Sequence, residues 1–312
     1  MRTTLHIIQQ ASTFNWNSLI NQFLEKMKKN DLSVKTINAY KHDLSLFVKW
    51  IDTINPLKNL HALTEIDIIE YRQHLINSDL KAATINRRIG SIQRLCRWAV
   101  EYKLLKEDVS KVVKQINITT RGCPIGLKPA EVQRLLQTAG QSKHGHSKRN
   151  YALLHLMLQT GLRVNEVAEL KLKDIELGER SGMVTISLGK GRKTRTIPLN
   201  SKARRALKLY LNSKNRENST NSVFISERQT ALSTRSIQSI ITELAKRANI
   251  SRIRVSPHTL RHTFAINYLK QNPSNIVQLA NLMGHESLDT TAIYTQPSME
   301  DLADNLELMA KG

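Results

Sequence analysis

The stretch "SPHTLRHTFAINYL", residues 256–269, sets the interpretation of the second half of this chain. Ser256 is a preferred N-cap residue and Pro257 suits the first helical position, so we predict that a helix begins here. His258 and Arg261 then stand three positions apart, on one face of the first turns. Free backbone N–H groups and the positive end of the helix dipole gather at the same terminus, which favours a bound phosphate. The alternative is a solvated helix start whose charges are incidental.

The composition of the chain indicates a polyanionic partner. Its 312 residues include 47 Lys plus Arg against 26 Asp plus Glu, which gives a net charge of +21. Nucleic acid is the commonest partner of so basic a protein. A membrane surface is the alternative, but the sequence contains neither an apolar run of the ~18 residues that a membrane-spanning helix needs nor a signal peptide. We therefore expect no membrane partner.

The cysteines indicate a reducing compartment. Only Cys96 and Cys123 occur, and their separation matches no metal-ligand spacing. Disulfide scaffolds and zinc fingers are therefore not expected, and a reducing cytoplasm fits.

The length is sufficient for two domains, and the first block is predicted to be helical. Residues 32–51 and 82–100 each place apolar side chains at helical spacing. The apolar positions are Ile37, Tyr40, Leu44, Phe47, Val48 and Ile51 in the first segment and Ile85, Ile89, Ile92 and Leu95 in the second. The other faces carry basic residues, among them Lys35, Lys41, Arg87, Arg88, Arg94 and Arg97. A solvated face and a set of DNA phosphate contacts both remain open, although acidic residues are absent from residues 81–100.

A second, mostly helical block with a small sheet follows a linker. Residues 114–130 have no strong period and contain two glycines and two prolines, which is typical of a linker. Helices are predicted within 128–139 and 150–161. Residues 183–199 alternate as a β-hairpin, in which Gly189 and Gly191 allow a tight turn. The tip of this hairpin is basic and carries Lys190, Arg192 and Lys193.

Two further motifs carry candidate functional residues. In "TGLRVNEVAEL", Arg163 stands near a helix start and Glu166, three positions later, can hold its guanidinium in one orientation. In "LMGHESLDTTAIYTQ", Gly284 is predicted to end a helix, with His285 directly after it and Tyr294 further on. A surface ion pair and a Tyr packed beside a His are the ordinary alternatives.

These motifs together favour phosphoryl transfer without metal ions. The sequence shows no cluster of carboxylates, which two-metal catalysis requires. Arginines can instead neutralise the reacting phosphate through bidentate hydrogen bonds. Tyr294 would then be the nucleophile, and because a phenol has a pKa of about 10, nearby cations and a base must help remove its proton. Lys190, on a mobile hairpin, could protonate a leaving 5′-hydroxyl.

The motifs "TGLRVNE", "GKGRKTRTIPL", "SPHTLRHTFAINYL" and "LMGHESLDTTAIYT" occur in the order found in the tyrosine recombinase (phage integrase) family. The chain resembles this family, and within it the compact Xer-type and transposon or plasmid resolvase members. The resemblance implies that Arg163, His258 and Arg261 activate the scissile phosphate and that His285 is a second activating position. It makes Lys190 the general acid, Tyr294 the nucleophile and Glu166 a supporting acid.

The resemblance also implies an architecture and a reaction. The fold would be mainly α with a small antiparallel β-sheet in the second domain, arranged as a two-domain DNA clamp. Tyr294 would cleave one strand through a 3′-phosphotyrosyl link, with no cofactor and no metal. A homo-tetramer on two double-stranded DNA recombination sites would exchange strands through a Holliday junction, for resolution or integration of a mobile element, plasmid or chromosome. Accessory DNA-binding proteins remain open.

The predicted boundaries follow from these blocks. They are an N-terminal extension at 1–15, a helical core-binding domain at 16–105, a linker at 106–126, a catalytic domain at 127–297 and a C-terminal helix at 298–312. The last segment spaces Met299, Leu302, Leu306 and Met309 along one helical face. By resemblance it docks on a neighbouring protomer, and the alternative is that it folds back on its own domain.

Two other functions remain as alternatives. Charge and helices would suffice for a sequence-specific DNA-binding protein without catalysis, but the complete set of six candidate catalytic residues argues against it. A type IB topoisomerase-like enzyme would share the chemistry, but the small first domain fits sequence-directed binding better.

Overall fold

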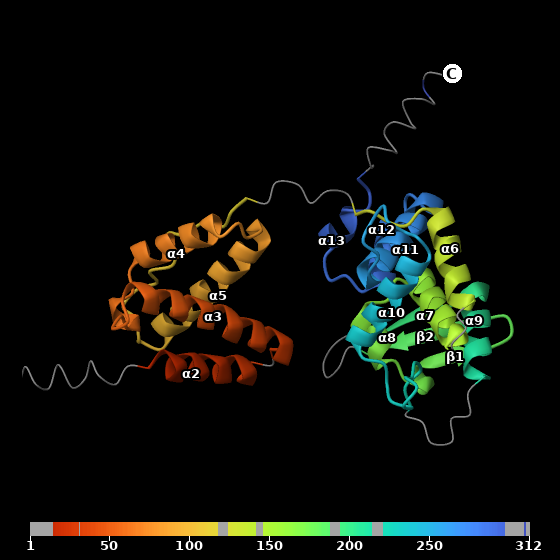
Figure 1. Cartoon of the computed structure of the whole chain (residues 1–312), viewed down its shortest axis with the longest axis horizontal. Helices are drawn as coiled ribbons and strands as arrows, with labels where there is room; N and C mark the ends of the chain where they lie inside the picture. The colour runs from red at the N-terminus through yellow and green to blue at the C-terminus, as the bar shows by residue number, and fades with distance from the viewer. Residues whose placement is uncertain are drawn as a thin grey trace, which may run out of the picture. The chain divides into compact units, whose positions relative to one another are not determined.

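The chain forms two compact units, residues 1–120 and 121–312 (Figure 1). The computed structural model describes residues 15–30, 32–117, 124–141, 146–187, 194–213, 221–296 and Met309. In these ranges no helix combines the length and the apolar character that crossing a membrane requires.

The described part of the first unit is helical. It comprises α2 (Trp16–Lys29), α3 (Val34–Ile54), the 3-10 turn η1 (Leu60–Ala62), α4 (Glu65–Asn77) and α5 (Ala82–Glu101). The side chains of Asn15, Ser33 and Thr64 accept hydrogen bonds from the first backbone N–H groups of α2, α3 and α4. Each helix thus begins where a side chain replaces a missing backbone acceptor.

The predicted apolar faces form the core of this unit. Leu44, Phe47 and Ile51 on α3 are buried, as are Ile85, Ile89, Ile92 and Leu95 on α5. Ile37, Tyr40 and Val48 are partly buried and pack against the same cluster. The predicted helical spacing of both segments is confirmed.

A buried carboxylate connects α3 to α5. Asp43 is 1% exposed and accepts hydrogen bonds from the guanidinium of Arg87 and from the hydroxyl of Ser91, the latter at 2.9 Å. A buried charge is costly unless it is paired in this way. Arg87 therefore contributes to the fold of the first unit.

The first unit continues past the Leu105 at which the sequence prediction ended it. Leu105 and Val113 are buried in its core. The Asn86 side chain donates to the carbonyl of Ile116 and accepts from its N–H, each at 2.8 Å. This segment lacks helical periodicity, so its packing left no local pattern in the sequence.

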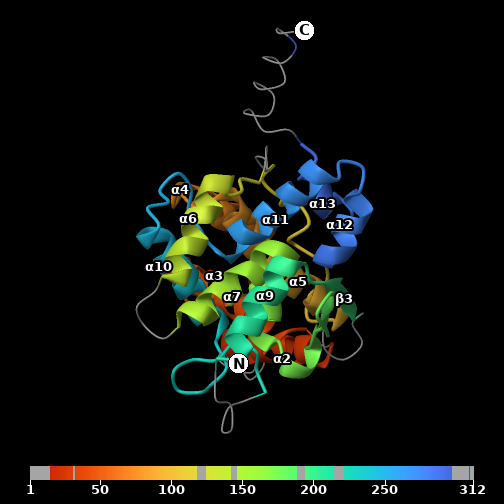
Figure 2. The ribbon, with the colours of Figure 1, turned by 90° about the vertical axis from the view of Figure 1, so that its right-hand side faces the viewer.

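The second unit is built around α7 (Ser147–Thr160). The other elements are α6 (Pro129–Gly140), α8 (Val164–Glu169), η2 (Leu172–Asp174), β1 (Ile175–Leu177), β2 (Gly182–Ile186), β3 (Arg195–Pro198), α9 (Ser201–Leu211), α10 (Thr234–Arg247), α11 (Pro257–Gln271), α12 (Ile276–Met283) and α13 (Asp289–Ala292). Helices α6, α9 and α11 pack on α7 (Figure 2). Leu153, Leu154, Leu156 and Met157 are fully buried. An apolar surface on several sides is typical of a helix enclosed by others.

The sheet contains the predicted hairpin. Strands β2 and β3 pair antiparallel, with Val184 opposite Ile197. Strand β1, which the sequence analysis did not predict, pairs with the other edge of β2 in the order β1-β2-β3. The tip of the hairpin, residues 188–193, lies outside the described residues. The mainly helical fold with a small antiparallel sheet is confirmed.

Replacing Phe47 by Ala should destabilise the first unit by about 3–5 kcal/mol, because a large buried aromatic leaves a cavity. The Phe47 ring is fully buried and contacts the rings of Trp16 and Tyr71. All three tryptophans of the chain lie in this unit, so urea unfolding followed by tryptophan fluorescence reports on it. Leu57→Ala, at a side chain that is 92% exposed, is the control and should change stability by less than about 0.5 kcal/mol. Equal effects of the two changes would contradict the assigned core.

Candidate active site

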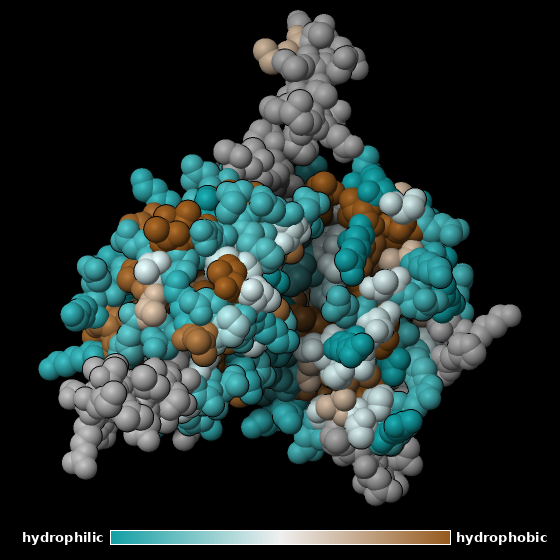
Figure 3. Space-filling view, turned by 60° about the vertical axis from the view of Figure 1, so that its left-hand side comes forward, coloured by the Kyte–Doolittle hydropathy of each residue, from teal (hydrophilic) through white to brown (hydrophobic). Residues whose placement is uncertain are grey.

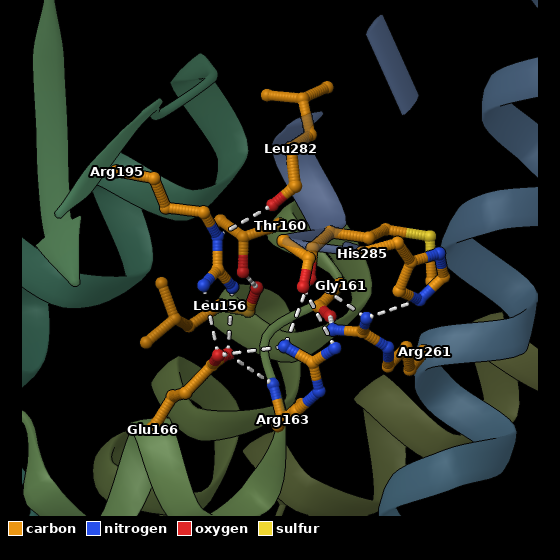
Figure 4. Close-up of polar contacts among 11 residues, drawn as sticks. Leu156, Thr160, Gly161, Arg163, Glu166, Arg195, Arg261, Leu282 and His285 are labelled. Carbon is orange, nitrogen blue, oxygen red and sulfur yellow. Dashed lines mark hydrogen bonds and ion pairs between the residues drawn. The ribbon is translucent and has the colours of Figure 1, made fainter. Parts of the chain in front are cut away.

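Three arginines converge on the C-terminal end of α12 (Figure 4). The last carbonyls of a helix lack partners within the helix and carry the negative end of its dipole, so they attract cations. Arg195 Nε donates to the carbonyl of Leu282 at 3.0 Å. The carbonyl of Met283 accepts from Arg163 at 3.2 Å and from Arg261 at 2.8 Å. Both guanidiniums are therefore anchored to a single oxygen atom.

Local structure explains how Arg163 and Arg261 reach this point. Gly161 ends α7 with a φ of +64°, and a Cβ there would lie 2.3 Å from the Phe264 ring. Only glycine, which has no Cβ, readily adopts this positive φ with the Phe264 ring so close to its Cα. The tight end of α7 places Arg163 at the start of α8, and the carbonyl of Gly161 accepts from Arg261 at 2.6 Å. The predicted helix start at Ser256 is confirmed, since its side chain caps α11.

Glu166 holds two of the arginines. Its carboxylate accepts from the guanidinium of Arg195 at 2.9 and 2.8 Å and from that of Arg163 at 3.2 Å. It also accepts from the backbone N–H of Arg163 at 2.7 Å. Burial tends to raise the pKa of Glu166, but the hydrogen bonds and charges of the arginines outweigh it and leave the pKa lowered. Glu166 is therefore a buried anion whose acceptor positions are filled.

His285 is a neutral imidazole held between two partners. Its Nε2 lies 2.8 Å from Arg261 Nη2, and its Nδ1 lies 2.7 Å from the hydroxyl of Thr291. Since a guanidinium only donates, Nε2 must accept and Nδ1 carries the proton. Burial, followed by the charges of Arg261 and Arg163, lowers the pKa of His285 to about 4. In this state His285 orients Arg261.

Tyr294 follows α13 and contacts α11. Its hydroxyl lies 2.7 Å from Nδ1 of His262. Burial raises the pKa of Tyr294, although Arg261 and Arg163 oppose that rise. The phenol is therefore protonated and bonded to a histidine, within the electrostatic influence of both arginines.

The structure brings five of the predicted residues together and leaves others aside. Arg163 bonds to Glu166, and Arg261 bonds to His285. Tyr294 bonds to His262, the residue that follows Arg261 on α11. His258 lies one turn before Arg261 and is exposed. Lys190, Arg192 and Lys193 lie outside the described residues. On the first unit Lys35, Lys41, Arg87 and Arg94 are exposed and Arg88 is half-buried.

Arg195 and His262 were not predicted as site residues. Arg195 begins β3, where hairpin alternation explains its position without a role at the site. His262 is part of the motif that begins at Ser256, but its partner Tyr294 is 32 residues away. Contacts over such separations leave no local pattern in one sequence.

The arrangement can bind a phosphate. A guanidinium has five N–H groups, and within the described residues three of them are engaged on Arg163 and three on Arg261. Two on each therefore remain for an anion. Three arginines against one glutamate leave the cluster with an excess of positive charge, which favours a phosphodiester over a neutral ligand.

A mainly helical domain that gathers arginines, a histidine and a tyrosine in one cluster has the arrangement expected of enzymes that cut DNA with a tyrosine. The chain belongs to the phage integrase family, the tyrosine recombinases: the family's model matches residues 126–301, and its N-terminal SAM-like domain matches residues 20–103. It is a tyrosine recombinase of the Xer type, an enzyme of site-specific DNA recombination.

Individual relatives span almost the whole chain. Tyrosine recombinase XerD of Bifidobacterium longum is 33% identical over 307 residues, which cover 94% of this chain and 96% of the relative. The TnP I resolvase of Bacillus thuringiensis is 28% identical, over 92% of this chain and 98% of its own. The fold matches the XerH recombinase bound to its palindromic difH substrate with a TM-score of 0.75, 22% identity, and coverage of 92% and 84%.

Glu166→Gln should lower the free energy of unfolding of the second unit by about 3–5 kcal/mol, because it leaves partly buried guanidiniums without their anion. Since the pKa of Glu166 lies below its ordinary value of 4.5, its contribution is complete above about pH 4.5 and is lost as the pH falls through the lowered pKa. The difference between wild type and variant should therefore shrink below pH 4.5. Urea unfolding followed by circular dichroism between pH 3 and 7 measures it.

The matched control for this change is Glu131→Gln, which breaks a similar carboxylate pair with Arg252 away from the three arginines. It should lower stability without altering single-strand cleavage. A constant difference between wild type and Glu166→Gln over the whole pH range would contradict the ionised state of Glu166.

Proposed function

We propose that the chain cleaves one DNA strand through a covalent bond between Tyr294 and a 3′-phosphate. Arg163, Arg261 and His258 bind the scissile phosphate, and His285, the second activating position, acts through its contact with Arg261. The observation that carries this proposal is the shared anchoring of both guanidiniums on the carbonyl of Met283. Because backbone carbonyls hold both guanidiniums, the remaining N–H groups are oriented before a substrate arrives, as electrostatic stabilisation of a transition state requires.

The charge of the reaction accounts for the arginines. Attack by Tyr294 converts a singly charged diester into a more negative phosphorane, and two guanidiniums neutralise the added charge. His285 supports this indirectly, because it accepts from Arg261 and fixes its orientation. Glu166 does the same for Arg163.

The leaving 5′-oxygen needs a proton, for which we propose Lys190. An alkoxide is a poor leaving group unless it is protonated as the bond breaks. Support for Lys190 comes from the family motif "GKGRKTRTIPL".

The released 5′-hydroxyl of one duplex then attacks the phosphotyrosyl link of the other. Two such exchanges pass through a Holliday junction and require a homo-tetramer on two DNA sites, with residues 298–312 of each protomer docked on a neighbour. Relatives named XerD and XerC and a transposon-type resolvase support this scheme over simple DNA binding or strand relaxation. The biological role within it is resolution or integration of a mobile element, plasmid or chromosome.

The first unit contributes DNA phosphate contacts to a two-domain clamp. Its basic side chains include Lys35, Lys41, Arg88 and Arg94. The view in Figure 3 shows a largely hydrophilic surface with scattered hydrophobic patches. Arg87 also pairs with Asp43, so its loss should affect folding as well as binding. Positive side chains on α-helices suit the phosphate backbone.

Tyr294→Phe should keep DNA binding and abolish covalent attachment, since it removes the nucleophilic oxygen and little else. A nicked suicide substrate traps the covalent product, which migrates slowly on a denaturing gel. The matched control is Tyr268→Phe, which removes a phenol bonded to Gln278, and it should still form the product. A covalent band with Tyr294→Phe would show that another residue attacks.

Lys190→Ala should slow cleavage by roughly 10²–10⁴-fold, the usual contribution of a general acid. A substrate with a 5′-phosphorothiolate should restore most of the rate, because sulfur leaves without a proton. Single-turnover cleavage of both substrates measures this. An equal defect on the two would mean that Lys190 binds the phosphate and does not protonate the leaving group.

A further inference from the structure

The hydroxyl of Tyr294 has one hydrogen-bond partner assigned to it in the described residues, and that partner is a histidine outside the predicted set. His262 Nδ1 lies 2.7 Å from Tyr294 Oη, with the two rings 5.6 Å apart and tilted by 51°. His262 follows Arg261 directly on α11, so the helix that supplies a phosphate-binding arginine also reaches the nucleophile. Leu269, Leu279 and Met283 belong to the small apolar cluster on which Tyr294 packs.

We propose that His262 takes the phenolic proton of Tyr294 during strand cleavage and returns it during religation. This inference rests on the proposed function, in which Tyr294 is the nucleophile. His262 touches the reacting oxygen and is therefore a catalytic residue in this proposal.

Two other candidate bases of the site, His285 and Glu166, are engaged. Both nitrogens of His285 are occupied, by Arg261 and Thr291. The carboxylate of Glu166 accepts from two guanidiniums. Within the described residues, His262 is the remaining titratable side chain with an acceptor atom at hydrogen-bond distance from the phenol.

The surroundings of His262 keep it ready to accept a proton. Burial, followed by the nearby His258 and Arg261, lowers its pKa. A neutral imidazole protonated on Nε2 has a lone pair at Nδ1, which is the atom that faces Tyr294. The protonated form is disfavoured by Arg261, but a bound phosphate between Arg261 and Arg163 would offset that repulsion. Proton transfer is therefore coupled to the presence of DNA.

The step balances. The O–H bond of Tyr294 breaks as an N–H bond forms at His262 Nδ1, the phenolic oxygen bonds to phosphorus, and the bond from phosphorus to the 5′-oxygen breaks. That oxygen takes its proton from Lys190, as proposed above. Religation reverses each transfer: the 5′-hydroxyl gives its proton to Lys190, and His262 protonates the departing phenolate.

The test combines His262 variants with a more acidic phenol at position 294. His262→Phe keeps an aromatic ring of similar size but cannot accept a proton, and it should slow covalent-complex formation by roughly 10²–10⁴-fold. Replacing Tyr294 by a trifluorinated tyrosine in the same protein should reduce that penalty at least tenfold, because this phenol ionises without a base. Single-turnover reactions of the full chain on a nicked suicide substrate measure both rates.

A second variant separates proton transfer from positioning. Asn at position 262 can place an amide oxygen near the site of Nδ1 and hold Tyr294, but it takes no proton at neutral pH. His262→Asn should therefore show a penalty close to that of His262→Phe, with the same rescue by the fluorinated tyrosine. The matched control is His155→Phe, which removes another buried histidine that lies beside a tyrosine. The ring centroids of His155 and Tyr151 are 4.4 Å apart. It should leave the rate unchanged.

Three results would contradict proton transfer by His262, and a fourth would contradict the proposed function itself. An equal penalty with either tyrosine, or a normal rate with Asn, overturns the proton transfer and leaves His262 a positioning residue. Faster cleavage by His262→Phe overturns it as well, since the bond would then restrain Tyr294. If the wild-type chain itself forms no covalent complex, the proposed function fails instead.

Discussion

The carbonyl oxygen of Met283 accepts from both Arg163 and Arg261, and the rest of the site depends on this shared contact. Two guanidiniums brought to one oxygen repel each other, and burial adds a desolvation cost. Together these effects lower the pKa of Arg261 to about 10, with burial the larger cause. The cluster is tolerable because its neighbours are acceptors: the negative end of α12, the carbonyl of Gly161, and the anion of Glu166. The excess positive charge that remains is what a phosphate can neutralise.

Arg195 connects the sheet to this cluster, and Gly284 leaves room for its guanidinium. Gly284 ends α12 with a φ of +64°, and a Cβ there would lie 2.6 Å from the guanidinium of Arg195. Arg195 in turn bonds to Glu166 with both terminal nitrogens. Arg195 thus links strand β3 to Arg163 through Glu166, and it lies directly against the turn at Gly284.

Local signals in the sequence were sufficient for some features and not for others. The cap at Ser256, the helix end at Gly284 and the alternation of β2 and β3 depend on neighbouring residues, and all three agree with the structure. The apolar stripes of α3 and α5 likewise show their buried faces through spacing alone. Contacts between distant segments gave no such signal. Strand β1 is too short for a pattern, and the chain after Leu105 packs through side-chain bonds to its backbone. Arg87 looked like a surface cation because its partner Asp43 is on another helix.

The same limit explains why the charge states of His285 and His262, and any role of His262, could not be inferred from the sequence. A histidine beside arginines reads as one more cation, yet burial and the neighbouring positive charges act in the opposite direction and favour the neutral ring. His285 thereby becomes an acceptor for Arg261. His262, in the tautomer that the proposed proton transfer requires, accepts from Tyr294. Permanent charge in this site comes from arginine, which cannot easily lose its proton, while proton transfer falls to groups whose charge depends on their surroundings. In the proposed mechanism, a phosphate bound at the cluster would offset the neighbouring positive charges and so raise the proton affinity of both rings. The site would then become basic toward the phenol when a diester is there for the phenol to attack.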